Sequence, residues 1–239
     1  MSAPVAVKIS ERLQQLSDPI KAAFLQKFFR TGPGQYAEGD VFIGVKVPDV
    51  RRLLREYRRL TTEDLLPLLE SPLHEERLFA LLALVRGFEK GTAVEREGIY
   101  SLYLATTDRI NNWDLVDCSA PQIVGGWLLE RERSVLYDLV RSGSLWERRI
   151  AVMATFAFIR AGQFDDTLRL AEMLLTDRED LIHKASGWML REAGKRDQTA
   201  LEGFLRKHGR IMPRTMLRYA IEKLPEDTRK TYLSGEACL

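Results

Sequence analysis

Apolar residues recur at helical spacing along almost the whole chain, and short breaker sequences separate these stretches. Thr31-Gly32-Pro33-Gly34 and Ser71-Pro72 are two such breakers. Strand-like alternation is confined to residues 35–47, where we expect an extended loop rather than a sheet. A chain with this pattern must bury its apolar faces helix against helix, so the sequence predicts an all-α fold.

Helix starts are marked by capping residues. Asp18 followed by Pro19 is a typical cap and first-turn pair, Pro48-Asp49 reopens a helix, and Thr61 caps the next. A buried-face helix with a charged first turn is predicted from His74. Further helices are predicted within residues 94–105, 124–129, 135–140, 144–152, 167–175, 181–190, 199–205, 216–224 and 228–233.

These helices form pairs that repeat at a period of roughly 40 residues. Each pair buries one face against the next, which favours an α-solenoid of HEAT-like antiparallel helix pairs over a closed bundle. No stretch of altered composition divides the chain. We therefore predict a single domain over residues 1–239.

Composition excludes several classes of protein. The two cysteines, Cys118 and Cys238, cannot form a disulfide framework, and no His/Cys cluster has the spacing of metal ligands. No apolar run is long enough to cross a membrane, and the first residues lack the features of a signal peptide. We expect a soluble cytoplasmic protein without a metal or cofactor, with its three histidines in solvent. A net charge of +2 gives only weak support for nucleic-acid binding.

Three segments combine tryptophan with charged residues: Trp113-Asp114-Leu115-Val116-Asp117, then residues 145–151 and residues 184–192. In the first, Asn111 or Asn112 is expected to cap a short helix on which Trp113 and Asp117 share one face. The segments are separated by roughly one repeat, and equivalent positions of a solenoid lie on the same concave surface. The spacing therefore predicts that Trp113, Arg149 and Trp188 converge on one groove.

Structural roles are the alternative for each of these residues. A helical tryptophan commonly packs in a core, and we expect Trp127 and Trp146 to do only that. Asp117 can pair with an arginine or offset a helix dipole. Arg148 and Arg149 can be a solvated pair, and the arginines of residues 51–59 are expected to form a charged outer face.

The three segments resemble the DNA alkylation repair family, the HEAT-like AlkD-type DNA glycosylases. The matching elements are Trp-Asp-x-x-Asp at residues 113–117, Trp-x-x-Arg at residues 146–149 and Lys-Ala-x-Gly-Trp-x-Leu-Arg-Glu at residues 184–192. The resemblance extends over residues 21–224. Residues 32–40 look longer than in the best-known members.

The resemblance implies excision of alkylated purines such as 3-methyladenine and 7-methylguanine from double-stranded DNA, during base excision repair and without base flipping. It places Asp117, Trp113 and Trp188 at the reaction and Arg149 on a backbone phosphate. Phe28 matches an aromatic position at which relatives carry a tyrosine.

The residues fit this chemistry. An alkylated cationic purine is already a good leaving group, and a fixed carboxylate stabilises the positive charge that grows on the sugar. Asp117 suits that role, while Trp113 and Trp188 offer π-faces to the cationic nucleotide. No lysine is placed as a Schiff-base nucleophile, so we expect a monofunctional glycosylase.

Binding to DNA is expected to come mainly from phosphate contacts along the concave groove. Besides Arg149, the candidate contacts are Arg148, Phe28, Lys184, Arg191 and Arg214. We expect a nucleoid-associated monomer that acts on DNA containing alkylated bases and not on membranes. Two alternatives are a non-catalytic HEAT-like module that binds distorted or branched DNA and a scaffold for protein interactions.

Overall fold

The computed structural model describes residues 4–236, and in this range the chain is helical without strands. The nearest approach to a sheet there is an isolated bridge between Val41 and Leu73. Residues 1–3 and 237–239 lie outside the described residues, and Cys238 with them. None of the described helices combines the length and the apolar character that a bilayer crossing requires.

The chain divides into two compact units, Met1–Ile123 (unit 1) and Val124–Leu239 (unit 2). The boundary falls within a π-helical turn, Pro121–Gly125. The single domain predicted from the sequence stays a prediction.

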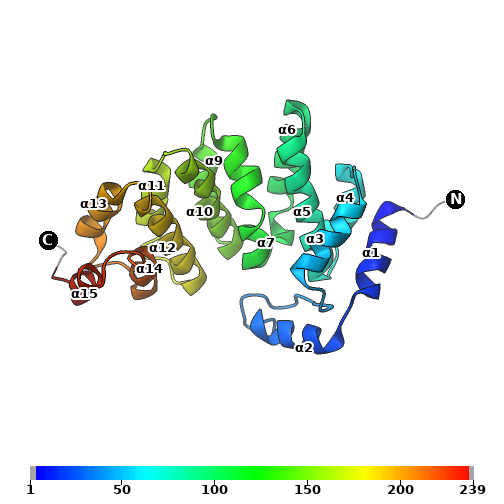
Figure 1. The fold of residues 1–239 in the computed structure, drawn as a ribbon, viewed down its shortest axis with the longest axis horizontal. Coiled ribbons are helices and arrows are strands. Elements are labelled where there is room, and N and C mark those ends of the chain that lie inside the picture. The colour runs from blue at the N-terminus through cyan, green and yellow to red at the C-terminus, as the bar shows by residue number, and fades with distance from the viewer. Residues whose placement is uncertain (1–3, 237–239) are drawn as a thin grey trace. The chain divides into compact units, whose positions relative to one another are not determined.

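Unit 1 consists of stacked helix pairs (Figure 1). Helix α1 packs on α4 and α4 on α6, while α3 packs on α5 and α5 on α7, so two rows of helices lie against each other. The helices are α1 (Val5–Gln15), α2 (Pro19–Phe28), α3 (Val47–Glu56), α4 (Thr62–Leu69), α5 (His74–Lys90), α6 (Ala93–Ala105) and α7 (Trp113–Asp117), with a 3-10 turn at Thr107–Arg109. The predicted solenoid architecture is confirmed.

Local capping explains where the helices of unit 1 begin. The Asp18 carboxylate accepts from the backbone N–H groups of Ile20 and Lys21 at 3.0 and 3.1 Å, so the predicted start at Pro19 is confirmed. Thr61 and Asp64 form a reciprocal capping box at the start of α4. Residues 35–46 form a loop rather than a sheet, as predicted, but residues 36–39 are turns and Val47 already begins α3.

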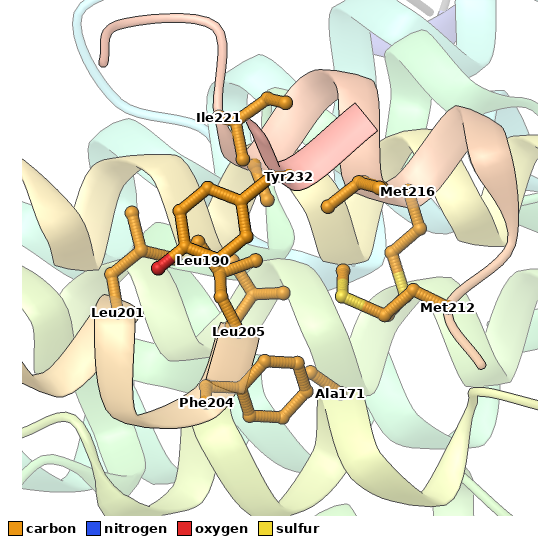
Figure 2. Close-up of a cluster of buried hydrophobic side chains, with 11 residues drawn as sticks. Ala171, Leu190, Leu201, Phe204, Leu205, Met212, Met216, Ile221 and Tyr232 are labelled. Carbon is orange, nitrogen blue, oxygen red and sulfur yellow. The ribbon is translucent and has the colours of Figure 1, made fainter. Parts of the chain in front are cut away.

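Unit 2 also consists of two rows of packed helices. Helices α10, α12 and α14 stack in series, with α9, α11 and α13 packed against this row. The helices are α8 (Gly126–Leu128), α9 (Ser134–Leu139), α10 (Leu145–Arg160), α11 (Asp165–Met173), α12 (Asp180–Gly194), α13 (Gln198–His208), α14 (Arg214–Ala220) and α15 (Glu226–Ser234). Figure 2 shows the apolar cluster that joins α11 to α15, in which Phe204, Leu205, Met216 and Tyr232 interlock.

Gly187 permits the close approach of α12 and α14. A Cβ at this position would lie 2.4 Å from the Met216 carbonyl oxygen and 2.6 Å from the Tyr219 Cβ. Both are far inside van der Waals contact, and the carbonyl belongs to a helix backbone that cannot rotate away. The glycine of the Lys-Ala-Ser-Gly-Trp segment is therefore required for packing in unit 2.

Gly187→Ala is expected to destabilise the protein by about 1–3 kcal/mol, the usual cost of overpacking. Urea unfolding measures the change. Gly203→Ala is the matched control, since Gly203 lies inside α13 and its added Cβ would meet nothing within 4 Å. Alanine is the better helix former, so the control is expected to gain about 1 kcal/mol. Equal effects of the two substitutions would contradict the packing role of Gly187.

Candidate functional site

Helix α7 contains the first tryptophan segment. Asn112, not Asn111, caps it: the backbone is extended (φ −151°) and the side-chain oxygen accepts from the Trp113 N–H at 2.8 Å. Trp113 and Asp117 are the first and last residues of this five-residue helix. Both residues therefore lie on one short helix, and their shared face stays a prediction from the spacing of four.

Trp113 packs against aromatic residues of α2 and the loop after it. Its ring stacks on Phe29 at a centroid distance of 5.1 Å and 20° between the planes. Phe28 meets the indole edge-on at 6.2 Å. Phe29 is buried, whereas Phe28 is 54% exposed. The structure thus brings together Trp113 and Phe28, two residues predicted to line one groove.

A buried ionic network lies behind α7. The His74 ring donates to Asp40 from Nδ1 at 2.8 Å and to Asp114 from Nε2 at 2.9 Å. Asp40 also accepts from the Arg77 guanidinium at 2.5 Å and from the Asn112 amide at 2.9 Å. The network therefore joins Asp40 of the 29–46 loop, the first turn of α5 and the start of α7.

The predicted exposure of the histidines is wrong for two of the three. His74 is 1% exposed and His208 is 6% exposed. The predicted charged first turn of α5 is present but buried, since Glu75, Glu76 and Arg77 are each 5% exposed or less. These charges have partners that are distant in sequence, which a scan of local helical periodicity does not detect.

Opposite charges set the ionisation of this network. Burial disfavours the charged form of His74, but the neighbouring carboxylates of Asp114 and Asp40 outweigh it and raise the pKa of His74 to about 9. Burial likewise works against ionised Asp40, yet the hydrogen bond and charge of His74 and the charge of Arg77 lower its pKa to about 2. At neutral pH, His74 is therefore an imidazolium between two carboxylates.

A second buried carboxylate fixes the loop before α3. Glu75 accepts from the backbone N–H groups of Ile43, Gly44 and Val45 at distances between 2.8 and 3.2 Å. Gly44 has φ +86°, and a Cβ there would lie 2.2 Å from the Asp18 carbonyl oxygen. The loop is held against α5 and α2 in a conformation that requires glycine at this position.

These contacts line part of an open cavity of about 550 Å³ on unit 1. Its walls are α2, Phe29, the loop residues Phe42 and 44–46, the start of α3, the first turns of α5 and Asp114. The lining is mostly aromatic and aliphatic. The sequence analysis did not predict this cavity. One signal was available: four ionisable residues in a row, 74–77, begin an otherwise apolar helix, which indicates buried charges with partners elsewhere in the chain.

Two predicted site residues of unit 2 are engaged within the protein. Arg149 is 4% exposed, and its guanidinium donates to the Leu181 carbonyl at 2.6 Å, which ties α10 to α12. Arg148 forms an ion pair with Asp177 at 2.7 Å and donates to the carbonyls of Ser142 and Gly143 at 3.0 and 3.1 Å. Neither arginine is the solvated side chain that the sequence left as an alternative.

The remaining tryptophans occupy different environments. Trp188 is partly buried on α12, with its ring tilted against Phe156 at 6.5 Å. Trp146 is buried, as predicted. Trp127 is partly exposed and lies under the guanidinium of Arg131 at 3.8 Å.

The other predicted DNA contacts differ in exposure. Lys184 is partly exposed and pairs with Asp180 at 2.8 Å. Arg191 is mostly buried and pairs with Glu222 and Glu192. Arg214 is exposed and donates to the Leu233 carbonyl at 3.1 Å. Trp113 lies in unit 1 and Arg149 and Trp188 in unit 2, so their convergence on one groove stays a prediction.

No group of three or more His, Cys, Asp or Glu side chains in residues 4–236 is arranged to hold a metal ion.

Comparison with known proteins identifies the family. The model of the DNA alkylation repair enzyme family matches residues 9–224. The chain belongs to this family. Membership implies a role in DNA repair, and it confirms the resemblance drawn from the three tryptophan segments.

A solved structure supports the fold assignment. A predicted DNA alkylation repair enzyme from Enterococcus faecalis is similar to this chain with a TM-score of 0.66 and 18% identity, over 88% of this chain and 97% of the other. At that identity the likeness establishes the fold. A search of proteins with curated functions gave no match.

The His74 network predicts a stability that depends on pH. The pKa of His74 is about 9 when folded and ordinarily 6.5, so its imidazolium stabilises the folded protein fully below about pH 6.5. This contribution, on the order of 3 kcal/mol, is expected to disappear as the pH rises from 6.5 through 9. Urea unfolding at intervals across that range measures it.

His74→Gln is expected to flatten this part of the pH profile. Because that variant can also fail to fold, NMR titration of the wild-type ring is the second measurement. A His74 ring that titrates near 6.5 in the folded protein would contradict the network's proposed ionisation.

Proposed function

We propose that this chain is a monofunctional DNA glycosylase that removes N3- and N7-alkylated purines from double-stranded DNA. The observation that carries the proposal is that Trp113 and Asp117 stand four residues apart on the capped helix α7, in a member of the DNA alkylation repair family. The capped start of α7 and the buried network anchor this helix through Asn112 and Asp114.

In the proposed reaction the leaving purine does not have to be protonated by the protein. Alkylation at N3 or N7 makes the purine cationic, so the electron pair of the breaking glycosidic bond neutralises it. Positive charge then develops on the deoxyribose, where a carboxylate held in place lowers the barrier because it needs no reorganisation. We assign this role to Asp117. Water attacks C1′ and passes its proton to the carboxylate, which completes the hydrolysis.

Trp113 provides the surface against which the charged nucleotide lies. An indole face attracts a cation, and stacking on buried Phe29 fixes the direction of that face. We assign a second such face to Trp188, carried over from the family motifs. The same motifs place Arg149 on a phosphate, a contact for which its guanidinium, now 4% exposed, would have to leave the Leu181 carbonyl. The link from Arg149 to Leu181 gives it a further role in positioning α12, the helix that carries Trp188.

Phosphate contacts are proposed for the exposed cations. Lys184 and Arg214 are accessible enough to meet a DNA backbone. Arg148 and Arg191 are committed to carboxylates and carbonyls, so their contribution to binding is proposed to be the positioning of neighbouring elements. Phosphate contacts are insensitive to base sequence, so little sequence preference is expected.

Release of methylated bases from alkylated duplex DNA tests the proposal. Asp117→Asn is expected to slow release by about 10²- to 10³-fold, the scale of losing one preorganised electrostatic group. Asp108→Asn is the matched control, since Asp108 is exposed and pairs with the neighbouring Arg109 at 3.1 Å. Single-turnover kinetics of both variants separate the chemical step from binding.

Absence of base release by the wild type would refute the enzymatic proposal. The alternative function would then be a non-catalytic module that binds DNA. Wild-type rates in Asp117→Asn would refute the role of Asp117 alone.

A further inference from the structure

Helix α2 exposes a stripe that combines large apolar side chains with a cation. Ile20, Phe24 and Phe28 are 85, 65 and 54% exposed, and Lys27 is exposed as well. Positions 20, 24, 27 and 28 have the spacing i, i+4, i+7, i+8, so their side chains share one face of the helix. Contiguous exposed apolar surface usually marks an interaction site, and the lysine within it favours a ligand that carries negative charge.

Helix α3 carries a second stripe, which is basic. Val47, Arg51 and Arg55 follow one another at intervals of four, so they share a helix face. Both arginines are exposed, as expected for the arginines of residues 51–59. Val47 lines the open cavity of unit 1, and so do Phe24 and Phe28 of the α2 stripe. The two stripes therefore border the same cavity.

The positive charge on this part of the chain is not compensated. Every carboxylate within residues 18–55 is engaged inside the protein: Asp18 pairs with Lys21, Asp49 pairs with Arg52 at 2.6 Å, Glu38 accepts from the Gly34 N–H at 2.9 Å, and Asp40 belongs to the His74 network. The exposed cations of the same stretch that have no ion pair within the described residues are Lys27, Arg30, Lys46, Arg51 and Arg55. The surface of α2 and α3 is therefore complementary to an anionic ligand.

Both stripes reach helix α7, which carries the proposed catalytic residues. On α2, Phe28 meets the Trp113 ring edge-on at 6.2 Å. On α3, Arg51 lies near Cys118, the residue that ends α7. Burial raises the pKa of the Cys118 thiol to about 12, and the positive charge of Arg51 opposes this rise. The apolar and basic surface is thus continuous with the proposed reaction site.

We propose that these two stripes form one face that binds the sugar–phosphate backbone of duplex DNA beside the lesion, with their cations on phosphates and Phe24 against a deoxyribose. The inference rests on the proposed function, which makes duplex DNA the substrate. Arg51 and Arg55 stand about 6 Å apart along the axis of α3, and one DNA strand carries a phosphate for about every 3.4 Å of the duplex axis, so the two arginines can meet neighbouring phosphates. The deoxyribose is the apolar part of the backbone, and the base pairs stay stacked.

The salt dependence of binding tests the phosphate contacts. Fluorescence anisotropy of a labelled, undamaged duplex with the full-length protein gives the slope of the logarithm of the binding constant against the logarithm of the salt concentration. Arg51→Ala and Arg55→Ala are each expected to make this slope shallower by about 0.9, the contribution of one phosphate contact. Lys90→Ala is the matched control and is expected to leave the slope unchanged. Lys90 is exposed, has no ion pair within the described residues, and ends α5 about 24 Å along the helix from His74.

The apolar part of the face has a different signature in the same experiment. Phe24→Ala is expected to weaken binding by about fivefold, the effect of losing roughly 40 Å² of buried apolar surface. This loss is expected at every salt concentration, with the slope unchanged, because no counterion is released by an apolar contact. Ile211→Ala is the matched control, since it truncates an apolar side chain that is 67% exposed in unit 2, and it is expected to change neither the affinity nor the slope.

Unchanged slopes in both arginine variants, or unchanged affinity in Phe24→Ala, would overturn the inference. So would binding to phosphatidylglycerol vesicles that is lost in Phe24→Ala while the affinity for DNA is kept, because the face would then meet a membrane. Dimerisation that depends on Phe24 in sedimentation velocity, again with the affinity for DNA kept, would make it a contact between copies. Base release by the wild type with unchanged slopes in the variants refutes the role of this face alone, and altered slopes without base release refute the glycosylase proposal alone.

Discussion

The imidazolium of His74, shared between Asp40 and Asp114, is the interaction on which the arrangement of unit 1 depends. It joins a loop, a long buried helix and the five-residue helix that carries Trp113. A buried charge is costly when its partner is missing, so each member of this group requires the others. Helix α7 is too short to be stable through its own hydrogen bonds, and the network provides the tertiary support that such a short helix needs.

Local structure was predictable because it depends on neighbouring residues. Asp18 and Pro19 start α2, and Thr61 with Asp64 starts α4, since a cap and its N–H partners lie within three residues. The buried network was not predictable in the same way. His74 finds its carboxylates 34 and 40 residues away, and nothing in the periodicity of its own helix indicates them.

In the candidate site, too, the features set by neighbouring residues were predictable and the contacts between distant residues were not. Trp113 and Asp117 lie on one short capped helix, as predicted, and the contact of Trp113 with Phe28 agrees with the predicted groove. The internal contacts of Arg148 and Arg149 could not be predicted, because Asp177 and the Leu181 carbonyl come from the following repeat. In the third tryptophan segment, residues 184–192, the packing role of Gly187 could not be predicted either. Gly187 lies against the backbone of α14, which comes later in the chain.

The anchoring of the 29–46 loop has an evolutionary consequence. Asp40 is fixed by His74 and Arg77, and the three residues after Phe42 are fixed by Glu75. At its other end, the loop leaves α2 directly after Phe28. Residues 31–39 thus connect two fixed points, and insertions between such points cost little free energy. Relatives can therefore diverge in length and composition here while the helix bearing the proposed catalytic carboxylate keeps its place.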